Sequence, residues 1–392
     1  MKDIAALIMA DEASAESLAP VEDPAAFIAA VQRNARTRDL AAPEGSLFDA
    51  ARPGLLSLAR WSGTAPLAGS APPPRHWLPI AVAAEAGVVA VDWARFGPEP
   101  LRGPVYEADI RRVSRLPFNR AIHYRTALHD LATQAEAMDA LAPSGFIFHM
   151  SRCGSTLVAQ MLAALPDSIA ISEAPPLDAV VQLGRHFAED DAVRALRAIV
   201  AAFGRKRAGR ERRYVVKLDC WHTLALPLFR RAFPDVPWLF LYRDPVEVLV
   251  SQMRQRGMQT VPEYLPPAFY GIDAAESTTQ EEYCARVLAA VCRAALNHRG
   301  LGGALFLDYR LLPEAVFSAV LPHFGISCSD AEKELMRQTA RRDAKSPSLP
   351  FVGNAEAKRQ AATERLVHAA DSHLGEIYER LETLAAAPTC SP

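Results

Sequence analysis

Residues 146–165, which read FIFHMSRCGSTLVAQMLAAL, decide the fold of this chain. A short apolar run at 146–148 leads through Ser151 to Thr156 (SRCGST) into a segment rich in alanine and leucine. This order predicts a buried strand, a tight loop and a helix. Backbone N–H groups and the positive end of the helix dipole favour an anion at such a junction, phosphate above all. Arg152 adds a donor suited to bidentate binding of phosphate.

The loop alone leaves two interpretations open. Strand-to-helix turns with glycine and hydroxyl residues also occur where the hydroxyl only caps the helix. The loop is not a Walker A motif, which needs G-x-x-x-x-G-K-[ST]. Here no lysine follows Gly154, and no glycine stands five residues before it.

A second stretch favours the anion site. Residues 238–251 read WLFLYRDPVEVLVS, an apolar strand followed by a helix that contains Ser251. Pro245 stands just inside the helix start, where its missing N–H is not needed. Arg243 is therefore expected at the carboxyl end of a strand.

Together, SRCGST and YRDPVEVLVS resemble the two nucleotide-binding signatures of the sulfotransferase family, over roughly residues 144–351. The resemblance implies a P-loop-like α/β fold and 3′-phosphoadenosine 5′-phosphosulfate (PAPS) as co-substrate, with 3′-phosphoadenosine 5′-phosphate (PAP) as product. It is greatest for the bacterial and tyrosylprotein branches, where an arginine replaces the lysine of the cytosolic enzymes. The implied ligands of the 5′-phosphosulfate are Arg152, Cys153, Gly154, Ser155 and Thr156. Those implied for the 3′-phosphate are Arg243 and Ser251, with Arg342 and Lys345 in a later basic segment.

Sulfuryl transfer places the attacking and leaving oxygens in line, so the protein mainly positions both partners and neutralises charge. Arg152 would stabilise the leaving phosphate. Lys217 would reach the bridging oxygen or pair with a carboxylate. This scheme requires no metal.

An acceptor hydroxyl needs a general base, and three residues compete for that role. Glu173 resembles the glutamate base of the bacterial and tyrosylprotein branches and is favoured. Asp219 stands where the cytosolic enzymes have their histidine, and His222 follows three residues later. Asp219 ranks second and His222 third.

Composition indicates an ordinary globular protein. The 392 residues are 50% hydrophobic and 22% charged, with a net charge of −2, so no basic field indicates a nucleic-acid partner. Six cysteines without a CxxC pair indicate reduced thiols. We expect two units: residues 1–140, and a catalytic domain at 141–392.

The chain shows neither a secretory signal at its start nor a window of 18 uncharged apolar residues, which predicts a cytoplasmic protein without a membrane span. The acceptor stays open among small molecules, peptides and lipids. The first unit would form a wall of the acceptor pocket or a homodimer contact.

From residue 146 onward strands and helices alternate, which predicts a parallel sheet flanked by helices. Ligands of such sheets bind beyond the carboxyl ends of the strands. That rule gathers six polar residues in one neighbourhood: Arg152, Glu173, Lys217, Asp219, His222 and Arg243.

Other segments carry weaker signals. Residues 77–93 predict strands or a helix, residues 63–76 a loop, and residues 121–142 an amphipathic helix. The basic run at 205–213 is interpreted as a solvated loop, with a collar for an anionic acceptor or a membrane surface as the alternative. The proline- and aromatic-rich stretch at 256–277 predicts a lid.

Two rival functions remain. In an ATP- and Mg²⁺-dependent P-loop kinase, Ser155 would bind the metal and Asp244 would be the Walker B acid. The missing Gly-Lys pair opposes this. A catalytically silent nucleotide-binding protein of the same fold is the other rival, and the joint presence of Arg152, Glu173, Arg243 and Ser251 opposes it.

Overall fold

The computed structural model describes residues 11–37, 75–122, 124–135, 138–262, 264–273, 278–346, 348–351 and 355–386. Predictions on residues 1–10, on most of the link at 63–76, on lid residues 263 and 274–277, and on Cys390 lie outside them. The chain forms two compact units. The first consists of Met1–Leu141 and Ala174–Glu211, and the second of Ala142–Glu173 and Arg212–Pro392. The domain boundary near residue 140 stays a prediction.

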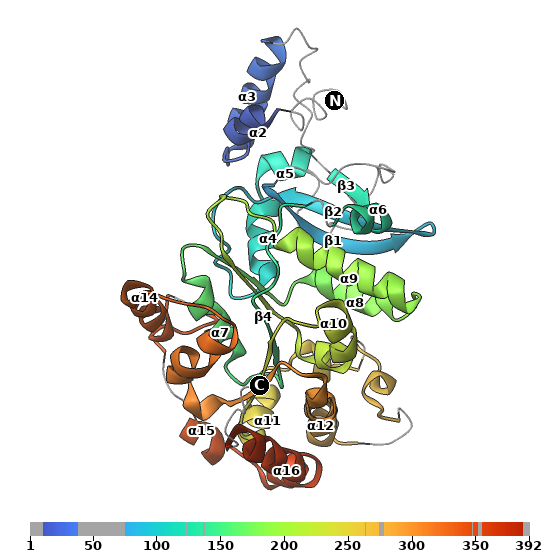
Figure 1. The fold of residues 1–392 in the computed structure, drawn as a ribbon, viewed down its shortest axis with the longest axis vertical. Helices are drawn as coiled ribbons and strands as arrows, with labels where there is room; N and C mark the ends of the chain where they lie inside the picture. The colour runs from blue at the N-terminus through green and yellow to red at the C-terminus, as the bar shows by residue number, and fades with distance from the viewer. Residues whose placement is uncertain are drawn as a thin grey trace. The chain divides into compact units, whose positions relative to one another are not determined.

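The second unit is built on a five-stranded parallel sheet with the order β5-β6-β4-β7-β8. Its central strand, β4, is labelled in Figure 1. The strands are β4 (Gly145–His149), β5 (Ser168–Ser172), β6 (Arg213–Lys217), β7 (Trp238–Tyr242) and β8 (Ala304–Asp308). Their residues form nearly continuous buried runs because helices cover the sheet. The predicted α/β class with a parallel sheet flanked by helices is confirmed.

Helices and short turns follow the strands of this sheet. They include α7 (Ser155–Ala163), η3 (Cys220–Ala225), α10 (Leu226–Ala232), α11 (Pro245–Arg254), α12 (Gln280–His298), η7 (Tyr309–Leu311), α14 (Asp330–Ala340), α15 (Ala355–Gln360) and α16 (Glu364–Ala386). Because β4 lies between β6 and β7, the segments that follow these three strands leave the same edge of the sheet side by side. The topology therefore gathers the strand-end residues of this unit.

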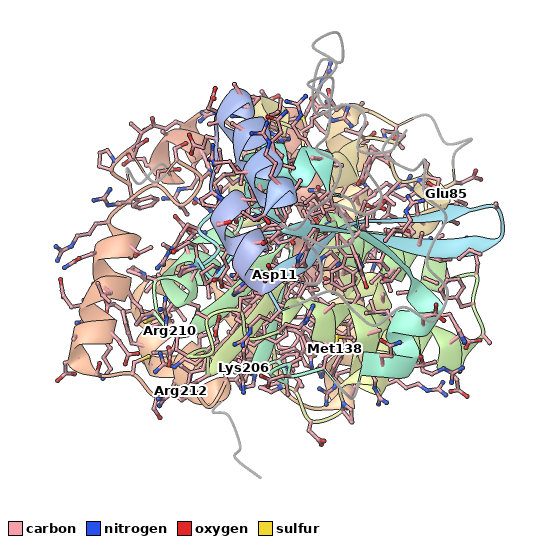
Figure 2. All side chains as sticks on the ribbon, turned by 90° about the horizontal axis from the view of Figure 1, so that it is seen from above. Asp11, Glu85, Met138, Lys206, Arg210 and Arg212 are labelled. Carbon is pink, nitrogen blue, oxygen red and sulfur yellow. The ribbon has the colours of Figure 1, made fainter. Side chains whose placement is uncertain are left out.

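The first unit contains a three-stranded antiparallel sheet with the order β1-β2-β3. Its strands are β1 (Trp77–Glu85), β2 (Val88–Arg95) and β3 (Tyr124–Ala127), and Glu85 lies near the tip of the β1–β2 hairpin (Figure 2). Helices α8 (Pro175–Gly184) and α9 (Glu189–Phe203) pack against β1. Residues 77–93 are thus strands, and the predicted additional α+β unit is present.

The helix predicted over residues 121–142 is wrong. Residues 124–127 instead form β3, which pairs with β2 and separates the end of α5 (Pro117–Ala121) from α6 (Leu128–Gln134). Arg125 helps to explain why this segment is a strand and not a helix. Its guanidinium bonds Asp92 at 2.6 Å and Glu85 at 2.8 Å across the sheet. These cross-strand ion pairs and the pairing of Thr126 with β2 outweigh the helical periodicity of the sequence.

The basic run at 205–213 includes a loop before β6, as the sequence suggested, and Arg210 and Arg212 are exposed, but other residues of the run are buried. Arg207 is buried and donates from Nη1 to the carbonyl oxygen of Gly97 at 2.6 Å. Arg213, in the second unit, bonds Asp167 at 2.7 Å and Glu332 at 2.6 Å. Lys206 and the exposed Arg210 are labelled in Figure 2. Structural contacts, rather than an anionic partner, thus account for Arg207 and Arg213.

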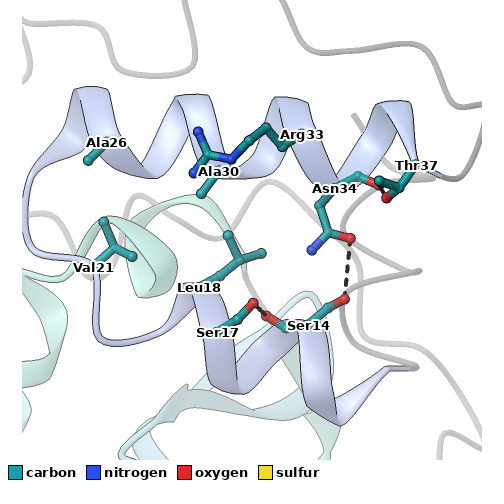
Figure 3. A pocket seen from close by; sticks show the side chains of 9 residues that line it. All are labelled: Ser14, Ser17, Leu18, Val21, Ala26, Ala30, Arg33, Asn34 and Thr37. Carbon is teal, nitrogen blue, oxygen red and sulfur yellow. Dashed lines mark hydrogen bonds between the residues drawn. The ribbon is translucent and has the colours of Figure 1, made fainter.

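A pocket of about 560 Å³ lies between α2 (Glu12–Leu18) and α3 (Pro24–Arg36) in the first unit (Figure 3). Leu18, Ala26 and Ala30 line it, and Ser14 donates to Asn34 at 3.3 Å on its rim.

Among the described residues, no helix is long and apolar enough to cross a lipid bilayer.

Candidate functional site

The loop after β4 has a strained backbone. Ser151, Arg152 and Gly154 have φ values of 77°, 51° and 87°, in the left-handed region that side chains other than glycine rarely adopt. A positive φ lowers the folding stability by roughly 1–3 kcal/mol at each non-glycine residue, here Ser151 and Arg152. Strain of this kind is typical of functional sites. The loop therefore has a shape that the surrounding structure must enforce.

Hydrogen bonds from three directions hold the loop in place. The Ser151 N–H donates to Nδ1 of His149 at 3.0 Å. The Ser151 hydroxyl accepts from Gln252 at 3.0 Å and from Gln259 at 2.9 Å. Arg152 donates from Nη2 to the carbonyl oxygen of Gln255 at 2.6 Å. The segment after β7 thus fixes the loop after β4.

Cys153 has a structural part in this loop. Its thiol is buried and donates to the carbonyl oxygen of Leu241 at 3.2 Å. Burial raises the pKa of the Cys153 thiol to about 12, so it stays protonated at neutral pH. The side chain is therefore no nucleophile. A contribution of Cys153 to ligand binding would come from its backbone.

Gly154 is required at the start of α7. In addition to its positive φ, a Cβ atom here would lie 2.8 Å from Cδ2 of Tyr309 and 3.0 Å from Cδ1 of Leu312. Ser155 and the half-buried Thr156 follow in the first turn of α7, where backbone N–H groups favour an anion. The absence of a side chain at 154 lets η7 approach this helix start.

Gly154→Ala is expected to destabilise the protein by roughly 1–3 kcal/mol beyond the cost of the same change at an uncrowded glycine of positive φ, because the methyl group would collide with Tyr309 and Leu312. Gly271→Ala is the matched control: Gly271 has a φ of 70°, and a Cβ there would meet nothing within 4 Å. Urea unfolding of both variants gives the difference. Equal losses would contradict a steric role for Tyr309.

Glu173 and Lys217 form a buried ion pair beyond β5 and β6. The Glu173 N–H donates to the Lys217 carbonyl at 2.8 Å, which continues the ladder between the two strands. Glu173 then turns with a φ of 49°, and its Oε1 bonds Nζ of Lys217. The Lys217 side chain is only 1% exposed, whereas that of Glu173 is 28% exposed. The Glu173 side chain is therefore partly accessible, whereas its lysine partner is not.

His149 is the third member of this group. Its Nε2 lies 2.9 Å from the Leu218 carbonyl and 3.5 Å from Oε1 of Glu173. Because Nδ1 accepts from Ser151, Nε2 carries the proton. Burial and the Lys217 charge lower the pKa of His149. Burial opposes the charge on Glu173, but Lys217 and His149 overcome it and lower the pKa of Glu173, so this carboxylate is ionised at neutral pH.

Asp219 and His222 lie together at the start of η3. The His222 N–H donates to the Asp219 carbonyl at 3.0 Å, and a carboxylate oxygen of Asp219 lies within 4.8 Å of a ring nitrogen of His222. His222 is 1% exposed, and its ring contacts those of Trp221 and Phe229. Asp219 is half-buried and is the more accessible of the two.

Arg243 lies at the carboxyl end of β7, as expected from the sequence. It is 4% exposed, donates from Nε to Glu247 at 2.7 Å, and stacks its guanidinium 3.9 Å from the centre of the Tyr309 ring. Ser251 is half-buried two turns into α11. Asp244 accepts the Glu247 N–H at 3.0 Å and so caps α11, which is a structural task.

Two lysines from the C-terminal part approach these residues. Lys345 is exposed at the surface, but desolvation of its ammonium group and the charges of Arg152 and Lys217 lower its pKa, so it lies near those two residues. Arg342 is exposed and pairs its backbone with Pro350. Lys358 on α15 is buried, and its charge interacts with those of Arg243 and Arg152.

The predicted site residues of β4, β5, β6 and β7 thus cluster, and Lys345 joins them. The sequence interpretation missed five contributors: His149, Glu247, Gln252, Tyr309 and Lys358. For His149 a signal existed, because it is the one titratable residue of an otherwise apolar strand. This cluster contains five cations, Arg152, Lys217, Arg243, Lys345 and Lys358, against four carboxylates, Glu173, Asp219, Asp244 and Glu247. Such a site attracts a ligand with several negative charges.

Residues 143–330 match the model of a family described as the sulfotransferase family. Among solved structures, a sulfotransferase domain from the curacin biosynthetic pathway has a TM-score of 0.39 and 15% identity, over 59% of this chain and 98% of that domain. A sulfotransferase from Mycobacterium avium has a TM-score of 0.37 and 11% identity, over 68% and 84% of the two chains. The sulfotransferase domain of a Synechococcus olefin synthase has a TM-score of 0.37 and 14% identity, over 64% and 97%. Comparison with curated protein sequences finds no significant match.

Proposed function

Residues 143–330 belong to the sulfotransferase family, and we propose that this protein transfers a sulfuryl group from PAPS to an acceptor hydroxyl or amine. The observation that carries the proposal is the convergence of Arg152, Lys217 and Arg243 from the ends of β4, β6 and β7. These cations lie around a glycine turn that opens a helix, where a phosphosulfate is favoured.

In the proposed reaction the acceptor oxygen or nitrogen forms a bond to sulfur while the bond from sulfur to the 5′-phosphate oxygen breaks. The sulfuryl group moves to the acceptor, and the bonding electrons stay on the phosphate of PAP. Arg152 and Lys217 would neutralise this growing charge. The acceptor proton would pass to a carboxylate of the site.

Glu173 is the proposed base. Its side chain is partly exposed, and its carboxylate is ionised and bonded to Lys217. The ion pair makes it a weak base in the free protein. When the donor's negative charge attracts Lys217, the carboxylate regains basicity at the moment an acceptor proton must leave. Asp219 ranks second, because it is more accessible than His222.

A calorimetric titration with PAP beside ATP–Mg²⁺ tests the proposed donor. We expect PAP to bind at least about tenfold more tightly, a difference of about 1.4 kcal/mol. Asp244 is occupied as a helix cap, which favours this outcome over the kinase alternative. Tighter binding of ATP–Mg²⁺ would overturn the proposal.

Arg243→Ala is expected to weaken PAP binding more than binding of adenosine 5′-phosphosulfate, which lacks the 3′-phosphate. A charge-assisted contact to phosphate contributes roughly 1.5–3 kcal/mol. Calorimetry with both ligands on one variant supplies its own control, since a general loss of structure weakens both. Equal losses would remove Arg243 from the 3′-phosphate.

A further inference from the structure

Glu247 is a buried carboxylate that bonds two arginines from distant parts of the chain. Its side chain is 5% exposed. Oε2 accepts from Nε of Arg243 at 2.7 Å, and Oε1 accepts from Nη1 of Arg359 at 2.8 Å. Arg243 directly follows the last residue of β7. Arg359 belongs to α15, which packs against α11. One side chain thus joins the strand-end arginine to the C-terminal part of the chain.

Lys358 stands next to Arg359 on α15. It is 6% exposed, and its charge interacts with those of Arg243, Glu247 and Arg254, which follow β7 along the chain, and with that of Arg152 in the loop after β4. Burial and these positive charges lower the pKa of Lys358 to about 8, with Glu247 opposing the shift. An ammonium group among three arginines is costly in the free protein and becomes favourable when an anion is bound.

We propose that Glu247 is a positioning residue that joins Arg243 to α15 and so holds Lys358 as a further anion-binding cation of this site. The inference rests on the proposed function, since the anion is the nucleotide donor. α15 has six residues, and a helix this short is not stable by itself in water. Its place therefore depends on contacts such as the Arg359–Glu247 pair, and Lys358 moves with it.

PAP affinity in single and double variants tests this link. Lys358→Met and Arg359→Met are each expected to weaken PAP binding about tenfold, the size typical of one charge-assisted contact. The double variant should lose little more than either single one, because both changes remove the same contact. Arg365→Met, an exposed arginine in the first turn of α16, removes equal charge and should stay within twofold of the unchanged protein.

The pH dependence supplies a second readout. Lys358 is protonated below its free pKa of about 8, so its contribution is complete there and declines as the pH rises further. Between pH 8 and 9.5 the affinity of the unchanged protein should therefore fall more steeply than that of Lys358→Met. Arg359→Met and Glu247→Gln should both show the shallower slope, although each retains the lysine.

The outcomes separate the inference from the proposed function. If the unchanged protein does not bind PAP, the proposed donor is wrong. If it binds PAP, two results each overturn the role of Glu247: Arg359→Met behaving like Arg365→Met, or single losses that add fully in the double variant. If Arg359→Met does not fold, the PAP affinity of Glu247→Gln between pH 8 and 9.5 is the test. A fall in affinity as steep as that of the unchanged protein would overturn the inference.

Discussion

Glu173→Gln is expected to lower turnover by about 10²–10⁴-fold, the usual effect of removing a general base. Glutamine keeps the size of the side chain and can still accept a hydrogen bond from Lys217, but it cannot take a proton. PAP affinity should not fall, because Glu173→Gln leaves every cation proposed to hold the nucleotide in place. Turnover with an accepted substrate and calorimetry with PAP measure the two effects.

The pH profile sharpens this prediction. Because Lys217 and His149 lower the pKa of Glu173 below its usual 4.5, the carboxylate stays ionised as the pH falls. The acidic limb of kcat/KM should therefore stay flat down to about pH 5. A neutral imidazole acting as base would instead lose rate below about pH 6.5.

Asp219→Asn and His222→Gln, made in parallel, should each cost less turnover than Glu173→Gln. The Glu173 variant is also expected to melt at a lower temperature, since it leaves the buried Lys217 charge without an anion. Turnover is therefore compared well below every melting temperature. If Glu173→Gln keeps near-normal turnover while Asp219→Asn abolishes it, Asp219 is the base.

Arg152→Ala is expected to lower turnover about 10²–10³-fold while PAP affinity stays within about tenfold. The reason is that charge on the leaving phosphate develops in the transition state, so its partner acts on turnover more than on binding. Arg152 also holds the Gln255 carbonyl, so Arg152→Lys, which keeps the charge, tests the electrostatic part. An unchanged turnover number in Arg152→Ala would remove this residue from the mechanism.

Local sequence predicted the second unit well. The apolar runs before SRCGST and RDPVEV are β4 and β7, and the glycine and proline at their ends begin α7 and α11 as expected. Such signals are local, since a strand, a turn and a helix start each depend on a few adjacent residues. In the first unit the periodicity over 121–142 misled, because the Arg125 ion pairs join residues far apart in sequence.

By itself, the sequence determined the order of strands and helices from residue 145 onward and the strand ends that carry Arg152, Glu173, Lys217 and Arg243. Only the tertiary structure decided which charges meet. Glu173 pairs with Lys217, and Glu247 bonds both Arg243 and Arg359. Lys358 belongs to a helix more than 100 residues after Glu247 in the sequence, yet its charge interacts with those of Glu247 and Arg243. The physical reason is that pairing and burial of charges depend on contacts between distant segments, and no local pattern of residue types records those contacts.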